Sequence, residues 1–227
     1  MKSLAAYAEV LAPWVSDARR ARIDAVLRER TRTVVPVCEG IYDQGNINAV
    51  LRSAESLGFQ SVHVIETGER FKRSNRISQG ADKWLDVHRH AGLRAGLQSL
   101  RSQGYRILAT TLSEKARPLA DFDFTQRTAI VFGNEKEGAS PELLSEADAH
   151  VIIPMVGFTQ SFNISVAAAL ALYPVQQDRL RRQGFHGDLS EEERERLRVL
   201  FYARSIPQPD RLLHQILTRA GLEDLRA

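Results

Sequence analysis

Four polar side chains lie close together in a segment that is otherwise apolar. An apolar stretch ending near Met155 passes through Pro154 and Gly157 into this polar set, and an apolar helix follows directly. The set is Thr159, Gln160, Ser161 and Asn163. Amide and hydroxyl groups between two buried elements satisfy backbone groups of a packed loop or hold a ligand. We therefore expect a closely packed, ligand-holding loop, although its residue types do not specify a reaction.

Two glycines and two glutamates follow another apolar strand, in the segment Gly133 to Gly138. The strand ends in Gly-Asn-Glu, with Glu135 the third residue. The glycine spacing fits neither the dinucleotide-binding turn nor the phosphate-binding loop, which argues against hydride transfer and ATP hydrolysis. The carboxyl edge of a parallel sheet is where open α/β folds bind ligands. A ligand-binding edge and a simple strand-to-helix turn are equally compatible with this segment alone.

Asn46 and Arg52 lie on one predicted helix, residues 46–59. Considered by themselves, Asn46 is expected to be the N-cap of the helix and Arg52 to lie on a solvated face. Covalent catalysis is unsupported, because Ser161 has no neighbouring histidine and no nucleophile elbow surrounds it. His88 and His90 form the only close histidine pair, which is too thin a basis for a metal site. We expect no metal.

Strands and helices alternate between residues 33 and 182. The expected strands are 33–41, 61–67, 85–90, 106–112, 128–133 and 149–155, and the expected helices are 46–59, 93–103, 141–147 and 163–182. This alternation predicts an α/β domain with a mostly parallel sheet covered on both faces. Two helices divided by Pro13 are expected before it. After it we expect helices at 189–201, with a Ser190–Glu193 capping box, and at 210–220.

The whole-chain properties favour a nucleic-acid partner. The 227 residues suit one main domain with terminal extensions, and the formal net charge is +3. Arginines cluster near both ends, and the N-terminal group comprises Arg19, Arg20, Arg22, Arg28, Arg30 and Arg32. Such clusters suit phosphate-bearing partners, and basic helices are otherwise solvated faces. With Cys38 as the single cysteine and no segment long enough to span a bilayer, we expect a cytoplasmic protein without membrane contact.

Three motifs together resemble the SpoU branch of the SPOUT methyltransferases, the tRNA/rRNA 2′-O-methyltransferase family. The first is Asn46 followed six residues later by Arg52, and the second is the segment FGNEKEG from Phe132 to Gly138. The third runs from Ile153 to Ser165, with Phe162 and Ile164 where the family has Leu and Val. Order and spacing agree from about residue 33 to residue 183, which is about two thirds of the chain.

The resemblance implies a fold and a cofactor that the patterns alone do not give. The fold is an α/β domain whose C-terminal part forms a deep trefoil knot, in a homodimer. The cofactor is S-adenosyl-L-methionine. The resemblance implies that it is held mostly through backbone groups at Thr110, Gly133, Ile153 and Phe162. The expected domains are an N-terminal helical extension (1–32), the knotted methyltransferase domain (33–183) and a C-terminal helical extension (184–227).

The same resemblance assigns the catalytic residues. Arg52 would act on the ribose 2′-hydroxyl with help from the substrate phosphate, either as an electrostatic anchor or as a transient proton acceptor. The residues that would orient Arg52, the ribose and the loop are Asn46, Glu135, Ser161 and Asn163. Because an arginine has a pKa of about 12.5 or above, it is a weak candidate for a base.

The expected substrate is tRNA. Three features resemble those of the branch that methylates guanosine 18 of the D-loop. They are the arginine-rich N-terminal helix, the stretch SQGADKW from Ser78 to Trp84 and the extra C-terminal helices. rRNA with the same chemistry is the alternative acceptor. A rival of another class is a non-catalytic RNA-binding paralogue that keeps the fold.

Overall fold

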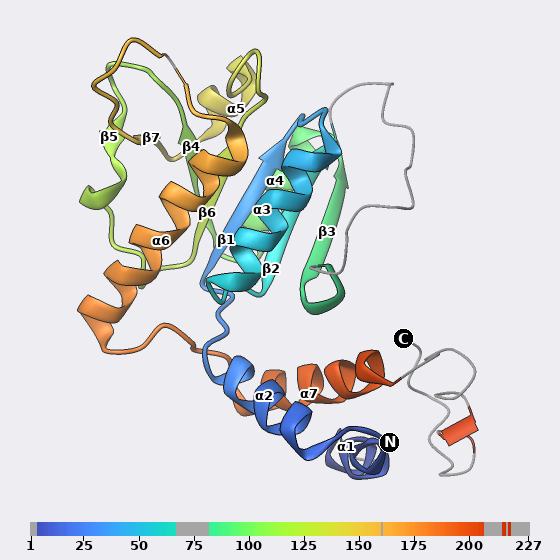
Figure 1. Cartoon of the computed structure of the whole chain (residues 1–227). Helices are drawn as coiled ribbons and strands as arrows, with labels where there is room; N and C mark the ends of the chain where they lie inside the picture. The colour runs from blue at the N-terminus through green and yellow to red at the C-terminus, as the bar shows by residue number, and fades with distance from the viewer. Residues whose placement is uncertain (1–3, 67–81, 160, 207–214, 217, 219–227) are drawn as a thin grey trace. The chain divides into compact units, whose positions relative to one another are not determined.

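The computed structural model describes residues 4–66, 82–159, 161–206, 215–216 and 218. The chain divides into two compact units (Figure 1), one formed by residues 31–186 and the other by residues 1–30 together with 187–227. The sequence predicted separate N-terminal and C-terminal extensions. In the structure the two extensions belong to one unit.

The larger unit is built on a seven-stranded sheet in which every neighbouring pair is parallel. The strand order is β3-β2-β1-β6-β4-β7-β5. The strands are β1 Val34–Glu39, β2 Ser61–Glu66, β3 Asp86–Ala91, β4 Arg106–Thr110, β5 Arg117–Pro118, β6 Thr128–Phe132 and β7 Ala149–Ile152. The predicted parallel α/β sheet is confirmed. β5 was not predicted, because two residues including a proline carry no alternation pattern.

Helices cover both faces of this sheet. The helices of the larger unit are α3 Gln44–Ser56, α4 Leu93–Ser102, α5 Pro141–Glu146 and α6 Ile164–Gln183. Val34 and Cys38 of β1 join the core under α3 and α6, while Val35 and Val37 join the core under α4 and α5. Successive side chains of a strand point to opposite faces. β1 therefore contributes side chains to two separate cores, one on each face of the sheet, and all six of its residues are buried.

The smaller unit is helical, with α1 Leu4–Leu11, α2 Asp17–Arg28 and α7 Glu191–Ser205. Pro13 lies in the short 3₁₀ helix between α1 and α2, so the predicted break is confirmed. The predicted Ser190–Glu193 capping box begins α7. Arg198 of α7 donates to Asp24 of α2 at 2.9 Å, which joins the two terminal segments. The predicted helix 210–220 falls largely outside the described residues, as does Ser78–Ala81 of the predicted tRNA-branch stretch.

The exposure of the N-terminal arginines differs from the expectation that the whole cluster faces RNA. Arg30 is 1% exposed, and Arg32 forms an ion pair with Asp86 at 2.6 Å. Arg19, Arg22 and Arg28 are exposed. Hydropathy and charge patterns do not distinguish a buried arginine from a surface one, because its long apolar stem can pack inside. None of the described helices is long and apolar enough to cross a bilayer.

Three histidines cluster between β2 and β3. The ring of His63, which is 2% exposed, is stacked on His90 at 5.1 Å and lies 4.6 Å from His88 between ring centroids. Its Nδ1 is 2.9 Å from His90 Nε2. Burial, with the neighbouring His88 and His90, lowers the pKa of His63 to about 3. The described residues hold no group of three or more His, Cys, Asp or Glu side chains suited to a metal ion.

The buried, neutral His63 should make the fold sensitive to acid. The unfolded chain binds a proton on this ring near pH 6.5, and the folded chain binds it only near pH 3. The contribution of His63 to the free energy of unfolding is therefore present above pH 6.5 and is lost as the pH drops toward 3. Between pH 7 and pH 5 the loss from this residue should be about 2 kcal/mol. Urea unfolding of the wild type and of His63→Leu at both pH values measures it. An equal loss in both proteins would exclude His63 as the source.

Candidate active site

A cavity of about 410 Å³ opens at the carboxyl edge of the sheet. It is lined by the loops that follow β4, β6 and β7, which are neighbours in the sheet. All four residues that the resemblance assigned to the cofactor line it, namely Thr110, Gly133, Ile153 and Phe162. Glu135 and Ser161 line it as well. Its size is in the range of about 300–1,000 Å³ usual for ligand and cofactor pockets.

The loop after β6 is held by its own backbone. Asn134 and Gly138 exchange two backbone hydrogen bonds of 2.9 Å, and Oδ1 of Asn134 accepts from the amide of Lys136 at 2.8 Å. Asn134 Nδ2 also donates to the carbonyl of Gly40 at 2.6 Å, which ties the loop to the end of β1. A Cβ atom on Gly133 would collide with the backbone of Gly138 and Ala139. The sharp return of this loop therefore requires glycine at position 133.

Thr110 is fixed by its side chain. Its Oγ1 donates to the carbonyl of Val131 at 3.0 Å, so β4 is tied to β6 at the cavity wall. The side chain is used within the sheet.

A chain of hydrogen bonds joins three segments beside the cavity. Asn46 Nδ2 donates to Glu135 Oε1 at 2.8 Å, and Asn163 Nδ2 donates to Asn46 Oδ1 at 3.2 Å. Asn163 also caps α6, since its Oδ1 accepts from the amide of Ser165 at 2.9 Å. The three side chains come from α3, the loop after β6 and the start of α6. We call this group the Asn46–Glu135–Asn163 link.

The prediction that Asn46 caps its helix is wrong. The helix begins two residues earlier, and its N-cap is Asp43, whose Oδ1 accepts from the amide of Gly45 at 2.7 Å. Asn46 therefore lies inside the first turn, where its side chain is free to bind Glu135. An acidic residue three positions before Asn46 was the sequence signal for the true cap.

Glu135 has an unequal pair of carboxylate oxygens. Oε1 accepts from Asn46, whereas Oε2 is buried and has no hydrogen-bond partner among the described residues. The negative charge of Glu135 also acts on the Cys38 thiol. Burial and, second to it, this charge raise the pKa of the thiol to about 12. A buried carboxylate oxygen that accepts no hydrogen bond is unfavourable by about 1–3 kcal/mol or more. This oxygen suits a hydrogen-bond donor of a bound molecule.

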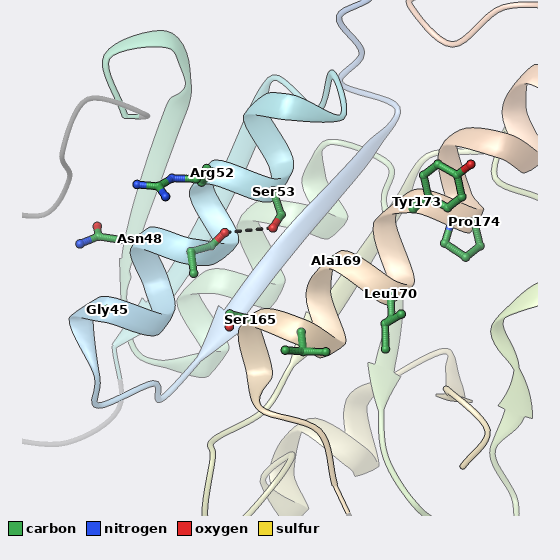
Figure 2. Close-up of a pocket in the computed structure, with 11 residues that line it drawn as sticks. Gly45, Asn48, Arg52, Ser53, Ser165, Ala169, Leu170, Tyr173 and Pro174 are labelled. Carbon is green, nitrogen blue, oxygen red and sulfur yellow. Dashed lines mark hydrogen bonds between the residues drawn. The ribbon is translucent and has the colours of Figure 1, made fainter. Parts of the chain in front are cut away.

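Arg52 is not part of this cavity. It lies six residues after Asn46, which corresponds to about 9 Å along α3, and it lines a separate groove of about 630 Å³ between α3 and α6. In Figure 2 its guanidinium extends away from α6. It has no hydrogen-bond or ionic partner among the described residues. The structure thus brings Asn46, Glu135, Ser161 and Asn163 to one site and leaves Arg52 outside it.

Lys136 is a cavity residue that the sequence reasoning did not select. It follows Glu135 directly in the second motif, so its place in the motif was the available signal. A cation at the rim of this cavity can bind a carboxylate or a phosphate.

Residues 33–173 match the SpoU rRNA Methylase family. This chain belongs to that family. A tRNA (guanosine(18)-2′-O)-methyltransferase of Borreliella burgdorferi is 36% identical over 197 residues, covering 87% of this chain and 90% of the relative. The enzyme of the same name from Thermus thermophilus is 37% identical and covers 73% of this chain and 86% of its own.

Solved structures agree with this assignment. The A. aeolicus TrmH/SpoU tRNA modifying enzyme matches with a TM-score of 0.74 at 28% identity, covering 85% of this chain and 98% of that one. The SpoU methyltransferase AviRb from Streptomyces viridochromogenes, in complex with the cofactor AdoMet, matches at 28% identity. Its TM-score is 0.55, with 68% of this chain and 60% of that chain covered.

Substitution of Gly133 should abolish cofactor binding, whereas substitution of the nearby Gly157 should not. Gly133→Ala places a methyl group against the backbone of Gly138 and Ala139 and so displaces the loop after β6. Gly157→Ala is the matched control, because the nearest atom to a Cβ at this position would be Thr159 Oγ1, at 3.9 Å. Calorimetric titration with S-adenosyl-L-methionine measures both. Equal affinities of Gly133→Ala and the wild type would contradict the assigned cavity.

Proposed function

We propose that this chain transfers the methyl group of S-adenosyl-L-methionine to the ribose 2′-hydroxyl of guanosine 18 in tRNA. The observation that carries the proposal is the cavity lined by Thr110, Gly133, Ile153 and Phe162 beside the Asn46–Glu135–Asn163 link. The names of the Borreliella and Thermus relatives support tRNA as the acceptor. We also propose that the protein acts in the cytoplasm, where tRNA is available.

The residues of the cavity fit the cofactor. Backbone groups of the loops after β4, β6 and β7 would hold it, and Lys136, which lines the cavity, would bind its carboxylate. When bound, S-adenosyl-L-methionine supplies an electrophilic methyl group on a sulfonium. We also propose that the C-terminal part of this unit forms the trefoil knot that the resemblance implies. Convergence of these three loops on one cavity supports it.

The remaining chemistry concerns the acceptor, because a ribose hydroxyl is a poor nucleophile at neutral pH. Its proton must be removed or the developing alkoxide stabilised. Glu135 Oε2, which has no hydrogen-bond partner among the described residues, would accept a hydrogen bond from the ribose, while Asn46 holds the other oxygen of the carboxylate. Arg52 binds the substrate phosphate through its forked donors and stabilises negative charge at the acceptor.

We propose that the chain acts as a homodimer through the groove between α3 and α6. Val166, Leu170 and Tyr173 of α6 are 42–56% exposed along this groove. Figure 2 shows Leu170 and Tyr173 on α6 across from Ser53 on α3. Apolar side chains gathered in a groove favour an interface. A second copy here places Arg52 at the boundary between the two chains, where it can serve a site that both chains complete.

Exposed arginines of the helical unit are proposed to bind the tRNA backbone. Arg19, Arg22 and Arg28 lie on α2 with exposed side chains. Contacts of this kind release counterions, so binding weakens as salt rises. Arg30, being buried, takes no part in them.

Incubation with radiolabelled S-adenosyl-L-methionine and separate tRNA and rRNA pools tests the function. We expect label in tRNA, and none in a tRNA that carries 2′-deoxyguanosine at position 18. Label in rRNA alone would contradict tRNA as substrate. Cofactor binding without label in either pool would indicate the non-catalytic paralogue.

Loss of Arg52 should slow turnover without affecting the cofactor. With RNA saturating, Arg52→Ala should lower kcat by about 100-fold or more, and Arg52→Lys should restore little because it lacks the planar fork. Arg94→Ala on α4, which covers the other face of the sheet, is the matched control. Steady-state methyl transfer at saturating RNA measures kcat for all three. Near-normal turnover of Arg52→Ala would refute the assigned role.

A charge in the groove should dissociate the homodimer. Leu170→Glu places a carboxylate among apolar side chains that the second copy covers, and desolvating it is unfavourable. Leu180→Glu, ten residues further along α6 and outside the groove, is the control. Sedimentation velocity should show a monomer for the first and a dimer for the second. A monomeric wild type, or a dimeric Leu170→Glu, would contradict this interface.

A further inference from the structure

Phe158 is an exposed aromatic residue in the loop that follows β7. Its relative exposure is 109%, and that of Val156 is 106%, which are the values of side chains with almost no neighbours. The loop is anchored on both sides of them, since Met155 and Ser161 line the cavity. Phe158 itself does not line the cavity, but it lies only three residues from Met155 and four from Phe162, which do.

The surroundings of the cavity mouth are divided in character. Leu112 and Phe162, which are 54% and 40% exposed, are apolar residues that line the cavity, and Phe158 adds an exposed apolar side chain four residues before Phe162. Polar groups come from the Asn46–Glu135–Asn163 link and from Lys136. A nucleotide has the same division, with an apolar base face on one side and a polar ribose and phosphate on the other.

The position of the acceptor sets where a base must lie. The ribose hydroxyl has to reach the methyl group held in the cavity, and the base is joined to that ribose by one bond. The base of the reacting nucleotide consequently lies at the cavity mouth. Proteins that recognise unstacked nucleotides commonly stack their bases on aromatic side chains.

We infer that Phe158 stacks on the base of the nucleotide whose ribose is methylated. The inference rests on the proposed function and adds a positioning residue for the RNA. A contact with a second copy of the chain is disfavoured, because Phe158 lies outside the α3–α6 groove, which has its own exposed apolar side chains. Since every base has an aromatic face, Phe158 supplies affinity and position, and it does not select guanine.

Steady-state methyl transfer with Phe158 variants tests the inference. Phe158→Ala should raise KM for RNA about tenfold or more, the scale of one base stacked on an aromatic ring. The affinity for S-adenosyl-L-methionine and the sedimentation behaviour should not change. Phe158→Trp should retain the wild-type KM, whereas Phe158→Leu should resemble Phe158→Ala. Phe185→Ala is the matched control, because Phe185 is also exposed, at 51%, and lies after α6 away from the cavity.

An abasic substrate identifies the stacked base directly. Once the methylated position has been mapped, an RNA that lacks the base there but keeps its ribose should bind the wild type as weakly as normal RNA binds Phe158→Ala. Phe158→Ala should lose nothing further with the abasic RNA, since both changes remove the same contact.

Several outcomes would overturn the inference while the proposed function stands. These are an active Phe158→Ala with unchanged KM for RNA, a Phe158→Leu equal to the wild type, a loss of cofactor affinity, or dissociation of the dimer. Independent, additive effects of Phe158→Ala and the abasic substitution would also overturn it. A wild type that methylates no RNA would overturn both proposals.

Discussion

The Asn46–Glu135–Asn163 link is the constraint on which the site depends. Its three side chains come from α3, the loop after β6 and the start of α6, which are about 90 and 30 residues apart along the chain. Asn46 and Glu135 are partly buried and Asn163 is exposed, so the hydrogen bond between Asn46 and Glu135 is the better shielded from water. The link therefore joins three distant segments at the edge of the cavity, where we propose that the acceptor approaches. The parallel sheet supports it by bringing the carboxyl ends of β4, β6 and β7 together.

In the proposed site, the cofactor side and the acceptor side are built by different means. The cofactor side uses backbone and close packing, with Gly133 as the residue that no side chain can replace. The acceptor side uses directed side chains, namely the link and Glu135 Oε2. Arg52 lies outside both, on an apolar groove that suits a second copy of the chain. This separation explains why a homodimer and a composite site belong to the same proposal.

Hydropathy alternation was sufficient to predict the main strands and helices, since two-sided burial produces apolar runs of recognisable length. Such patterns could not predict contacts between distant segments. Asn46 was expected to cap its helix because asparagine commonly does, but Asp43 occupies that position and leaves Asn46 to bind Glu135. The buried Arg30 and His63, and the packing of α7 against α2, likewise depend on tertiary neighbours that no local window contains. The motif residues around the cavity were identified through the family resemblance, while the position of Arg52 outside it required the structure.

A double-mutant cycle on Asn46→Ala and Asn163→Ala tests the central claim most directly, with single-turnover methyl transfer to tRNA and cofactor affinity as the two readouts. If the link acts as one unit, each single variant lowers the rate, the double variant is little slower than the slower single one, and cofactor affinity is unchanged. Rate losses that multiply in the double variant, or a parallel loss of cofactor affinity, would contradict the claim that this link positions the acceptor.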